Sequence, residues 1–353
     1  MHNSLHKPLL LAALTLLLLS ACRKEYSNTI LTTDTGSDPS LLYDQGHTPV
    51  CWIYAMCACI EREALHHGDS ITLSRQWLLA RLMEEETTRE FLTTRSNGNT
   101  LKASEEQEYV TDPEGHGAAQ SDSRMAFSLR GVGPDALRLI RLYGLLPYQH
   151  ERSRVEVGNV MVRRLTAMTQ TARSLSQLRD DMSQILPHFT VARESNRFVY
   201  YSMTYTPKQF AESIMYRQQW EFLASVDYHP WGERFALEVE DNHLHHLYLN
   251  MPIDTLLNRT VSSLRNGHPV YWEYGDPLPP TRKGSKRGGA TSRHAMAIIR
   301  LVKDKKGKEW LLCQNSYGNK WGNHGRCLIS KDFFLKHTCN VGIVVPCGVE
   351  SEE

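Results

Sequence analysis

Three residues have the side chains that nucleophilic catalysis by a thiol requires. Cys51 supplies the thiol, and His294 and Asn315 follow much later in the chain. A neutral imidazole is the usual base for a nucleophilic Cys, and an Asn side chain can orient that imidazole as an Asp does in a serine triad. In this order the three residues predict attack on a carbonyl carbon by the sulfur of Cys51.

The residues just before Cys51 predict that it lies in the first turn of a helix. Thr48 can cap a helix whose first residue is Pro49, a position where a missing amide proton is tolerated. The dipole and free amides of a helix N-terminus favour a thiolate over a thiol. The alternative is a buried and unreactive Cys51, which is the commoner fate of a free Cys.

Hydrophobic periodicity divides the chain into an early helical part and a late β-rich part. Helices are predicted in the ranges 49–67, 74–86, 135–143, 155–185 and 254–265. Strands are predicted in the ranges 270–274, 295–302, 310–313, 326–329 and 341–345, with a hairpin turn at 304–308. The polar stretch 93–124 is expected to be a long exposed loop. This segregation of helices and strands predicts an α+β protein with two lobes.

The two later residues flank predicted strands. His294 comes directly before the strand at 295–302 and after a polar, Gly-rich loop at 279–289. Asn315 begins the sequence Asn-Ser-Tyr-Gly-Asn-Lys-Trp-Gly after the strand at 310–313. With Gln45 six residues before Cys51, these patterns are similar to those of papain-like cysteine peptidases of the C1 family.

The resemblance runs from about residue 42 to 345 and implies a papain-like two-lobe α+β fold. Its N-terminal lobe would be helical and its C-terminal lobe antiparallel and β-rich, with helical insertions. Relative to the family, insertions are expected at about 93–124 and 151–205. Cys51 would be the nucleophile, His294 the base and later the acid, and Asn315 the residue that fixes the imidazole. The Gln45 side chain and the Cys51 amide would hold the oxyanion.

The resemblance assigns further residues to substrate binding and shielding. Trp321 would shield the His–Asn contact from water, and Gly131 and Gly133 are the nearest match to a pair of glycines that binds substrate backbone. A peptide or protein substrate is expected, without a cofactor or metal. The segment 243–246, His-Leu-His-His, is the alternative metal site, but no paired Cys or HExxH spacing accompanies it.

Four further segments resemble the bleomycin hydrolase and aminopeptidase C branch, namely 142–147, 205–210, 248–254 and 266–272. Enzymes of that branch carry a C-terminal arm that blocks the cleft, so that only chain ends fit. Here eight residues, 346–353, follow the last predicted strand and carry three Glu residues. We therefore expect an endopeptidase that does not require an oligomer, with an aminopeptidase as the alternative.

The first 22 residues have the pattern of a bacterial lipoprotein signal peptide. An 11-residue apolar run, 9–19, is too short to span a bilayer, which takes ~20 residues. It ends in Leu-Ser-Ala-Cys, which resembles a lipobox, so lipid is expected on Cys22. Residues 1–21 would be the signal peptide, 22–41 a tether and 42–353 the peptidase domain. This places the protein in the bacterial cell envelope, at a periplasmic or surface face. An ordinary signal peptide is the alternative.

Composition excludes several other classes. Hydrophobic residues make up 41% and charged residues 22%, which is typical of globular proteins. The net charge is +1, so no nucleic-acid partner is expected. Eight Cys are too few for a disulfide-built scaffold, and the six besides Cys22 and Cys51 are either buried thiols or up to three disulfides. A catalytically idle binding lipoprotein and a thiol acyltransferase remain the rival functions.

Overall fold

The computed structural model describes residues 43–46, 48–96, 128–150, 159–186, 197–216, 218–275 and 293–345. Several sequence predictions lie outside these ranges: the signal peptide, the lipid site at Cys22, the tether, most of the loop at 93–124, the loop at 279–289 and the C-terminal residues 346–353. Within the described ranges, no helix combines the length and apolar character needed to cross a bilayer.

The helices begin with α2, which is buried along almost its whole length because it lies between the sheet and the other helices. In chain order the helices are α2 (Cys51–His66), α3 (Arg75–Ser96), α5 (Gly133–Tyr143), the 3-10 turn η1 (Tyr148–His150), α6 (Asn159–Thr171), α7 (Leu175–Ile185), α8 (Pro207–Met215), α9 (Ile253–Arg265) and α10 (Lys331–His337). The predicted helices are present, but α3 continues ten residues beyond the predicted end, so residues 93–96 are helical rather than part of a loop.

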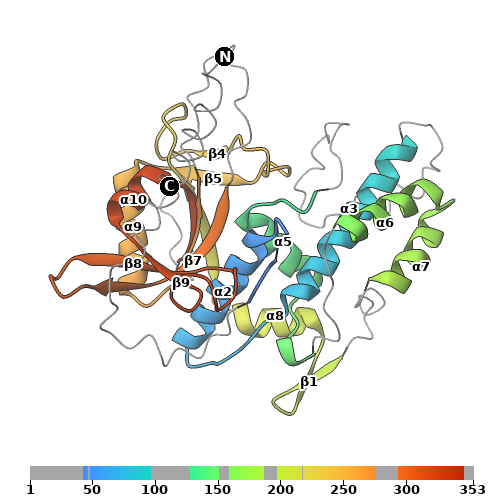
Figure 1. Cartoon of the computed structure of the whole chain (residues 1–353), viewed down its shortest axis with the longest axis horizontal. Helices are drawn as coiled ribbons and strands as arrows, with labels where there is room; N and C mark the ends of the chain where they lie inside the picture. The colour runs from blue at the N-terminus through green and yellow to red at the C-terminus, as the bar shows by residue number, and fades with distance from the viewer. Residues whose placement is uncertain are drawn as a thin grey trace, which may run out of the picture.

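The single long helix predicted at 155–185 is wrong, because the chain breaks between α6 and α7. Ser174 is extended and its hydroxyl accepts a hydrogen bond from the Gln177 amide (3.2 Å), which caps α7. A Ser at an N-cap satisfies an amide that the helix itself leaves free. Both helices pack against α3 (Figure 1).

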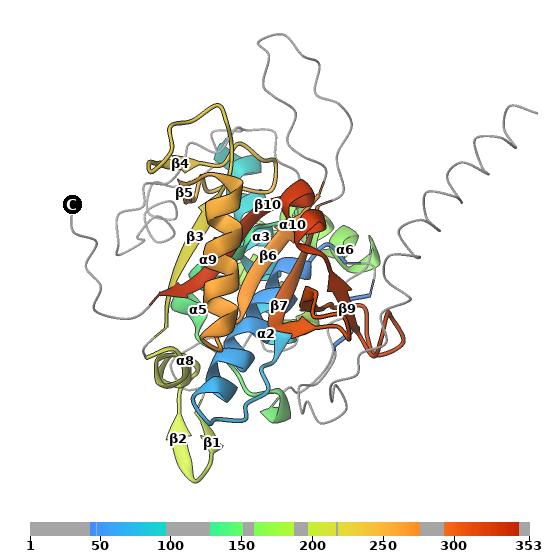
Figure 2. The ribbon, with the colours of Figure 1, turned by 90° about the vertical axis from the view of Figure 1, so that its left-hand side faces the viewer.

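An eight-stranded sheet forms the centre of the molecule. Its strands are β3 (Gln219–Ala224), β4 (Arg234–Ala236), β5 (Leu247–Asn250), β6 (Val270–Tyr274), β7 (His294–Lys303), β8 (Glu309–Gln314), β9 (Arg326–Ile329) and β10 (Thr338–Val345). They lie in the order β4-β5-β3-β10-β6-β7-β8-β9, and only the β3–β5 pair is parallel. The five strands predicted from the sequence are β6 to β10. A separate hairpin, β1 (Phe198–Tyr200) and β2 (Met203–Tyr205), projects from the body (Figure 2).

Alternation along the strands gives the sheet two buried faces. Tyr271 and Ala295 point to α2, whereas Val270, Trp272 and Met296 belong to the core under α9. Successive strand residues point to opposite faces, so one strand can serve both cores. The result is an α+β architecture in which α2 covers one face and α9 the other (Figures 1 and 2).

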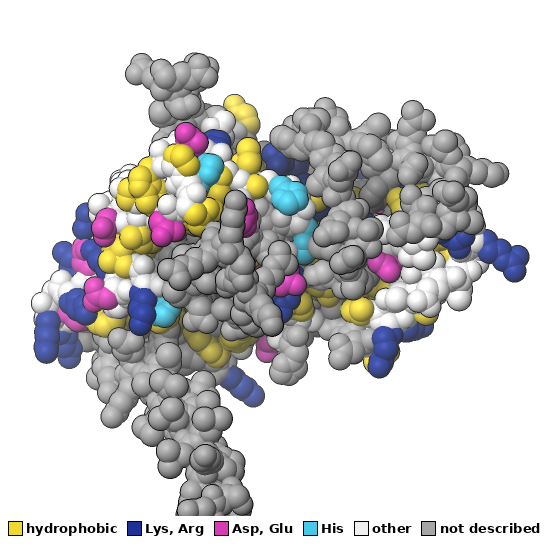
Figure 3. Space-filling view, turned by 90° about the horizontal axis from the view of Figure 1, so that it is seen from above, with side chains coloured by type: hydrophobic (Ala, Val, Ile, Leu, Met, Phe, Trp, Pro, Cys, Tyr) yellow, Lys and Arg dark blue, Asp and Glu magenta, His cyan; other side chains and the backbone are white. Residues whose placement is uncertain are grey.

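The described cysteines other than Cys51 are buried free thiols: Cys57, Cys59, Cys313, Cys327 and Cys339. The sequence allowed either buried thiols or disulfides, and at these five positions the structure has thiols. Cys347 lies outside the described residues. On the face shown in Figure 3, described Lys and Arg side chains lie scattered among acidic and apolar ones. This agrees with the balanced charge of the sequence.

Candidate active site

Cys51 lies in the first turn of α2, as the sequence predicts, but the helix begins at Cys51 itself and not at Pro49. Val50 is the N-cap residue and offers no side-chain cap. The Thr48 hydroxyl instead donates to the Gln45 carbonyl (2.6 Å), so the predicted Thr48 cap is wrong. The turn before the helix thus holds Gln45 beside Cys51.

His294 and Asn315 lie side by side because β7 and β8 form a hairpin. His294 begins β7 and Asn315 directly follows β8. His294 Nε2 lies 2.7 Å from Asn315 Oδ1, which also accepts from the Ser316 amide (2.8 Å). Because an amide oxygen only accepts hydrogen bonds, Nε2 must carry the proton. Nδ1 is then the basic nitrogen of the imidazole.

Tyr317, rather than Trp321, covers the imidazole. The Tyr317 and His294 rings are stacked with centroids 4.8 Å apart, and the Tyr317 hydroxyl lies 3.4 Å from His294 Nδ1. Trp321 contacts the edge of Tyr317 at a centroid distance of 6.1 Å. The sequence indicated only that Tyr317 is an aromatic residue two positions after Asn315. Trp321 therefore supports the residue that shields His294.

Gln45 is fixed between the two halves of the site. Its Nε2 donates to the Thr48 carbonyl (2.6 Å), its Oε1 accepts from the Ser316 hydroxyl, and its backbone amide donates to the Ser316 carbonyl (2.8 Å). An amide nitrogen carries two protons, so one proton of Nε2 remains for a ligand. Gln45 thus has the donor and the rigidity that an oxyanion site requires.

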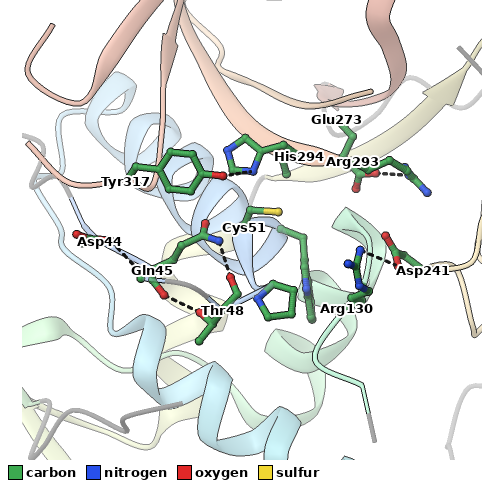
Figure 4. Close-up of a pocket in the computed structure, with 15 residues that line it drawn as sticks. Asp44, Gln45, Thr48, Cys51, Arg130, Asp241, Glu273, Arg293, His294 and Tyr317 are labelled. Carbon is green, nitrogen blue, oxygen red and sulfur yellow. Dashed lines mark hydrogen bonds and ion pairs between the residues drawn. The ribbon is translucent and has the colours of Figure 1, made fainter. Parts of the chain in front are cut away.

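These residues line one cavity of about 580 Å³ (Figure 4), within the usual size range of small-ligand pockets. Cys51 lies at its centre and His294 directly above it in the view of Figure 4. Gln45 and Tyr317 lie on one side of Cys51, and Arg130 and Asp241 on the other. The structure therefore brings Gln45, Cys51 and His294 together at one cavity, with Asn315 behind the imidazole.

The two predicted glycines have different surroundings. Gly131 lines the cavity, whereas Gly133 begins α5 and packs under the rings of Phe222 and Tyr271. A Cβ at Gly133 would lie 2.6 Å from the Phe222 ring. Close packing against the two rings explains why a glycine stands at position 133. Of these two glycines, only Gly131 lines the cavity, where substrate backbone can approach.

Replacing Gly131 is expected to damage the cavity. An added Cβ would lie 2.8 Å from the buried ring of Trp52, whose indole nitrogen donates to the Leu129 carbonyl (3.1 Å). Overpacking of this kind costs about 1–3 kcal/mol. We predict that Gly131→Ala lowers the free energy of unfolding by that amount, measured by urea denaturation. The double variant Gly131→Ala/Trp52→Phe should recover part of the loss, and full stability of the single variant would contradict the packing argument.

Burial dominates the electrostatics of the catalytic pair. Burial raises the pKa of the Cys51 thiol to about 11, although hydrogen bonds from the Ala295 and Trp52 amides lower it. The charged groups that act on it, Glu273 and Asp241, are both acids and also raise this pKa. Burial lowers the pKa of the His294 imidazole, although its hydrogen bond to Asn315 raises this pKa. Burial therefore favours a thiol and a neutral imidazole in the site without substrate, opposite to the effect that the helix N-terminus has on Cys51.

This charge state predicts how Cys51 alkylation depends on pH. Because only the thiolate reacts, a pKa near 11 makes the rate with iodoacetamide rise about tenfold per pH unit from pH 7 to 10. Mass spectrometry of the Cys51 peptide measures the rate, and the buried Cys57 serves as an internal unreactive control. A rate that already levels off below pH 8 would show that a thiolate–imidazolium pair forms without substrate.

Comparison with known proteins finds likeness in structure only. No protein-family model matches the chain, and no curated protein matches its sequence. The crystal structure of pepw from Lactobacillus rhamnosis matches with a TM-score of 0.55 and 16% identity, covering 88% of this chain and 82% of that one.

Two solved cysteine proteases match at lower TM-scores. Xylellain from Xylella fastidiosa matches with a TM-score of 0.39 and 13% identity, covering 88% of this chain and 84% of that one. The bromelain protease from Ananas comosus matches with a TM-score of 0.41 and 11% identity, covering 87% and 94%. The likeness to pepw and the mixed helical and antiparallel architecture show that the chain has a papain-like α+β fold.

Proposed function

We propose that the protein is a cysteine peptidase that uses Cys51, His294, Asn315 and Gln45. The observation that carries this proposal is the 2.7 Å contact between His294 Nε2 and Asn315 Oδ1. It assigns the proton to Nε2 and leaves Nδ1 basic in a cavity that also contains the thiol. A binding protein with an idle site has no need for this arrangement, which disfavours that rival.

The geometry supports the following reaction. As the Cys51 sulfur attacks the carbonyl carbon of the substrate, the thiol proton moves to His294 Nδ1. The free proton on Gln45 Nε2 and the Cys51 amide stabilise the resulting oxyanion. When the C–N bond breaks, Nδ1 returns its proton to the leaving amine. Water then attacks the thioester carbonyl and gives one proton to Nδ1. The C–S bond breaks, the carboxylic acid product leaves, and Nδ1 returns the proton to the Cys51 sulfur.

We further propose that cleavage occurs within peptides. The cavity has lining residues on both sides of Cys51, so a chain can extend in either direction from the bond that is cut. Digestion of a peptide acetylated at one end and amidated at the other tests this proposal. Internal cleavage supports it, whereas trimming that requires a free amino terminus supports the aminopeptidase alternative.

The membrane anchor is a separate proposal that rests on the sequence around Cys22. A lipid-modified Cys22 would hold the peptidase at a membrane of the bacterial envelope. Mass spectrometry of the purified protein should find a mature chain that begins at an acylated Cys22. An unmodified Cys22, or a different first residue, would remove the anchor without affecting the peptidase proposal.

A further inference from the structure

The part of the cavity away from Tyr317 is lined by charged side chains. Arg130, Asp241, Glu273 and Arg293 all face it (Figure 4). Such groups are rare in buried positions unless they are paired. Their partners therefore decide which of them remains free to bind a substrate group.

Glu273 is committed to Arg293 and to neighbouring groups of the fold. Arg293 Nη2 lies 2.5 Å from Glu273 Oε2, and this oxygen also accepts from Asn340 Nδ2 (2.8 Å). The other oxygen accepts from the Tyr271 hydroxyl and the Gly133 amide (3.3 Å). With four donors around it, Glu273 has little capacity left for a ligand.

Asp241 is in the opposite situation. Its side chain is 13% exposed, and its nearest ion-pair partner is Arg130 at 3.9 Å, which exceeds a hydrogen-bond distance. No described residue donates a hydrogen bond to the Asp241 carboxylate. The Arg130 side chain is half exposed, so it can turn to solvent at little cost. Asp241 thus offers an unsatisfied acceptor to the cavity.

The loop that carries Asp241, residues 237–246, is held rigidly. The Asn242 side chain is buried and bridges the loop, since its amide donates to the Leu237 and His246 carbonyls (3.1 Å each) and its oxygen accepts from the His246 amide (2.9 Å). The His246 imidazole is anchored to Asp135 at the start of α5 (2.8 Å). Asp241 is therefore positioned before any substrate arrives.

The electrostatics at the Asp241 carboxylate also favour a cation at that position. Burial raises the pKa of Asp241, while Arg293 and Arg130 lower it. A cation that contacts the carboxylate directly offsets the cost of burying its charge.

On these grounds, and given the proposed peptidase function, we propose that Asp241 forms a subsite for a positively charged group of the substrate. His294 must protonate the leaving amine, and Tyr317 stacks on His294, so the leaving side of the substrate runs past Tyr317. The acyl side then runs towards Asp241. The cation is a Lys or Arg side chain on the N-terminal side of the cut bond, or the free amino terminus of the substrate.

Fluorogenic coumarin peptides test this subsite. The residue at each of the first three positions before the coumarin is Lys, norleucine or Glu, because norleucine has the length of Lys without its charge. At one position we expect kcat/KM for Lys to exceed that for norleucine by about 10- to 100-fold, the range for hydrogen bonds to charged groups. Asp241→Asn should erase this preference, so that the ratio of kcat/KM for Lys to kcat/KM for norleucine falls to about 1.

The control variant is Glu233→Gln, which removes an equal charge from a 63% exposed side chain near the same loop and should keep the preference. Three results would overturn the subsite. The wild type could cleave Lys and norleucine peptides at equal rates, or it could prefer Glu. Alternatively, Asp241→Asn could lower kcat/KM by the same factor for all peptides. Acetylated and free peptides separate the two sources of the cation. If the rate advantage disappears when the amino terminus of the peptide is acetylated, the bound cation is the amino terminus and not a Lys side chain.

Binding to Cys51→Ala, measured by calorimetry, separates this inference from the proposed function. If acetylated Lys peptides bind this variant more tightly than norleucine peptides, and Asp241→Asn removes the difference, the subsite is present even if the wild type cleaves nothing. If the wild type cleaves peptides without any dependence on Asp241, the peptidase function stands and the subsite is wrong.

Discussion

Cys51→Ala is expected to abolish peptide hydrolysis. The sulfur is the only atom of that side chain that can form the thioester, and Ala leaves water as the remaining nucleophile. Removal of a catalytic nucleophile typically costs 10⁴-fold or more, so we expect kcat/KM to fall by at least about 10⁴-fold. The measurement is hydrolysis of any peptide that the wild type cleaves.

The matched control is Cys59→Ala, because Cys59 lies on α2 but is fully buried in the core. That variant loses one sulfur without touching the cavity, and it should retain catalysis at a small cost in stability. Comparable activity of Cys51→Ala and wild type would refute the assignment of the nucleophile.

His294→Ala is expected to lower kcat/KM more than Asn315→Ala does. His294 moves protons in both halves of the reaction, and general acid–base catalysis contributes about 10²- to 10⁴-fold. Asn315 only fixes the tautomer through one hydrogen bond to the imidazole. Loss of that bond is expected to cost about 10- to 100-fold.

The separate values of kcat and KM show whether Asn315 acts by orienting the imidazole. In Asn315→Ala the imidazole can take either tautomer, so the loss should lie mainly in kcat and not in KM. Asn340→Ala is the control, because Asn340 is equally buried but binds Glu273 rather than His294. If Asn315→Ala were as damaging as His294→Ala, Asn315 would have a larger role than orientation.

The sequence predicts which residues lie together at the candidate site better than it predicts the scaffold. Residue types and order were enough for Cys51, His294 and Asn315, because strong local patterns place them at a helix start and at strand ends. The strands β6 to β10 were also predicted from alternation. The strands β1 to β5 were missed; β1, β2 and β4 have only three residues each, too few for alternation to show. Helix α8 was missed although Thr206 and Gln209 form a capping box at its start.

What the sequence could not provide is the environment of each group. The raised pKa of Cys51 results from burial by segments that are distant in sequence, and a helix N-terminus alone predicts the opposite direction. Tyr317 could be recognised as the shielding ring only once its stacking on His294 was known. Asp241 belongs to a loop with no motif, and it enters the cavity because Asn242 and His246 hold that loop in place.

The most direct test of the central claim is reaction of the wild-type protein with a peptidyl epoxide, followed by digestion and mass spectrometry. The account predicts one adduct per chain, on the Cys51 sulfur, with hydrolytic activity lost in proportion to the adduct. Cys51→Ala should take up no label under the same conditions. No adduct on Cys51, or peptide hydrolysis that continues unchanged after Cys51 is fully labelled, would contradict the claim that Cys51 is the nucleophile of a peptidase.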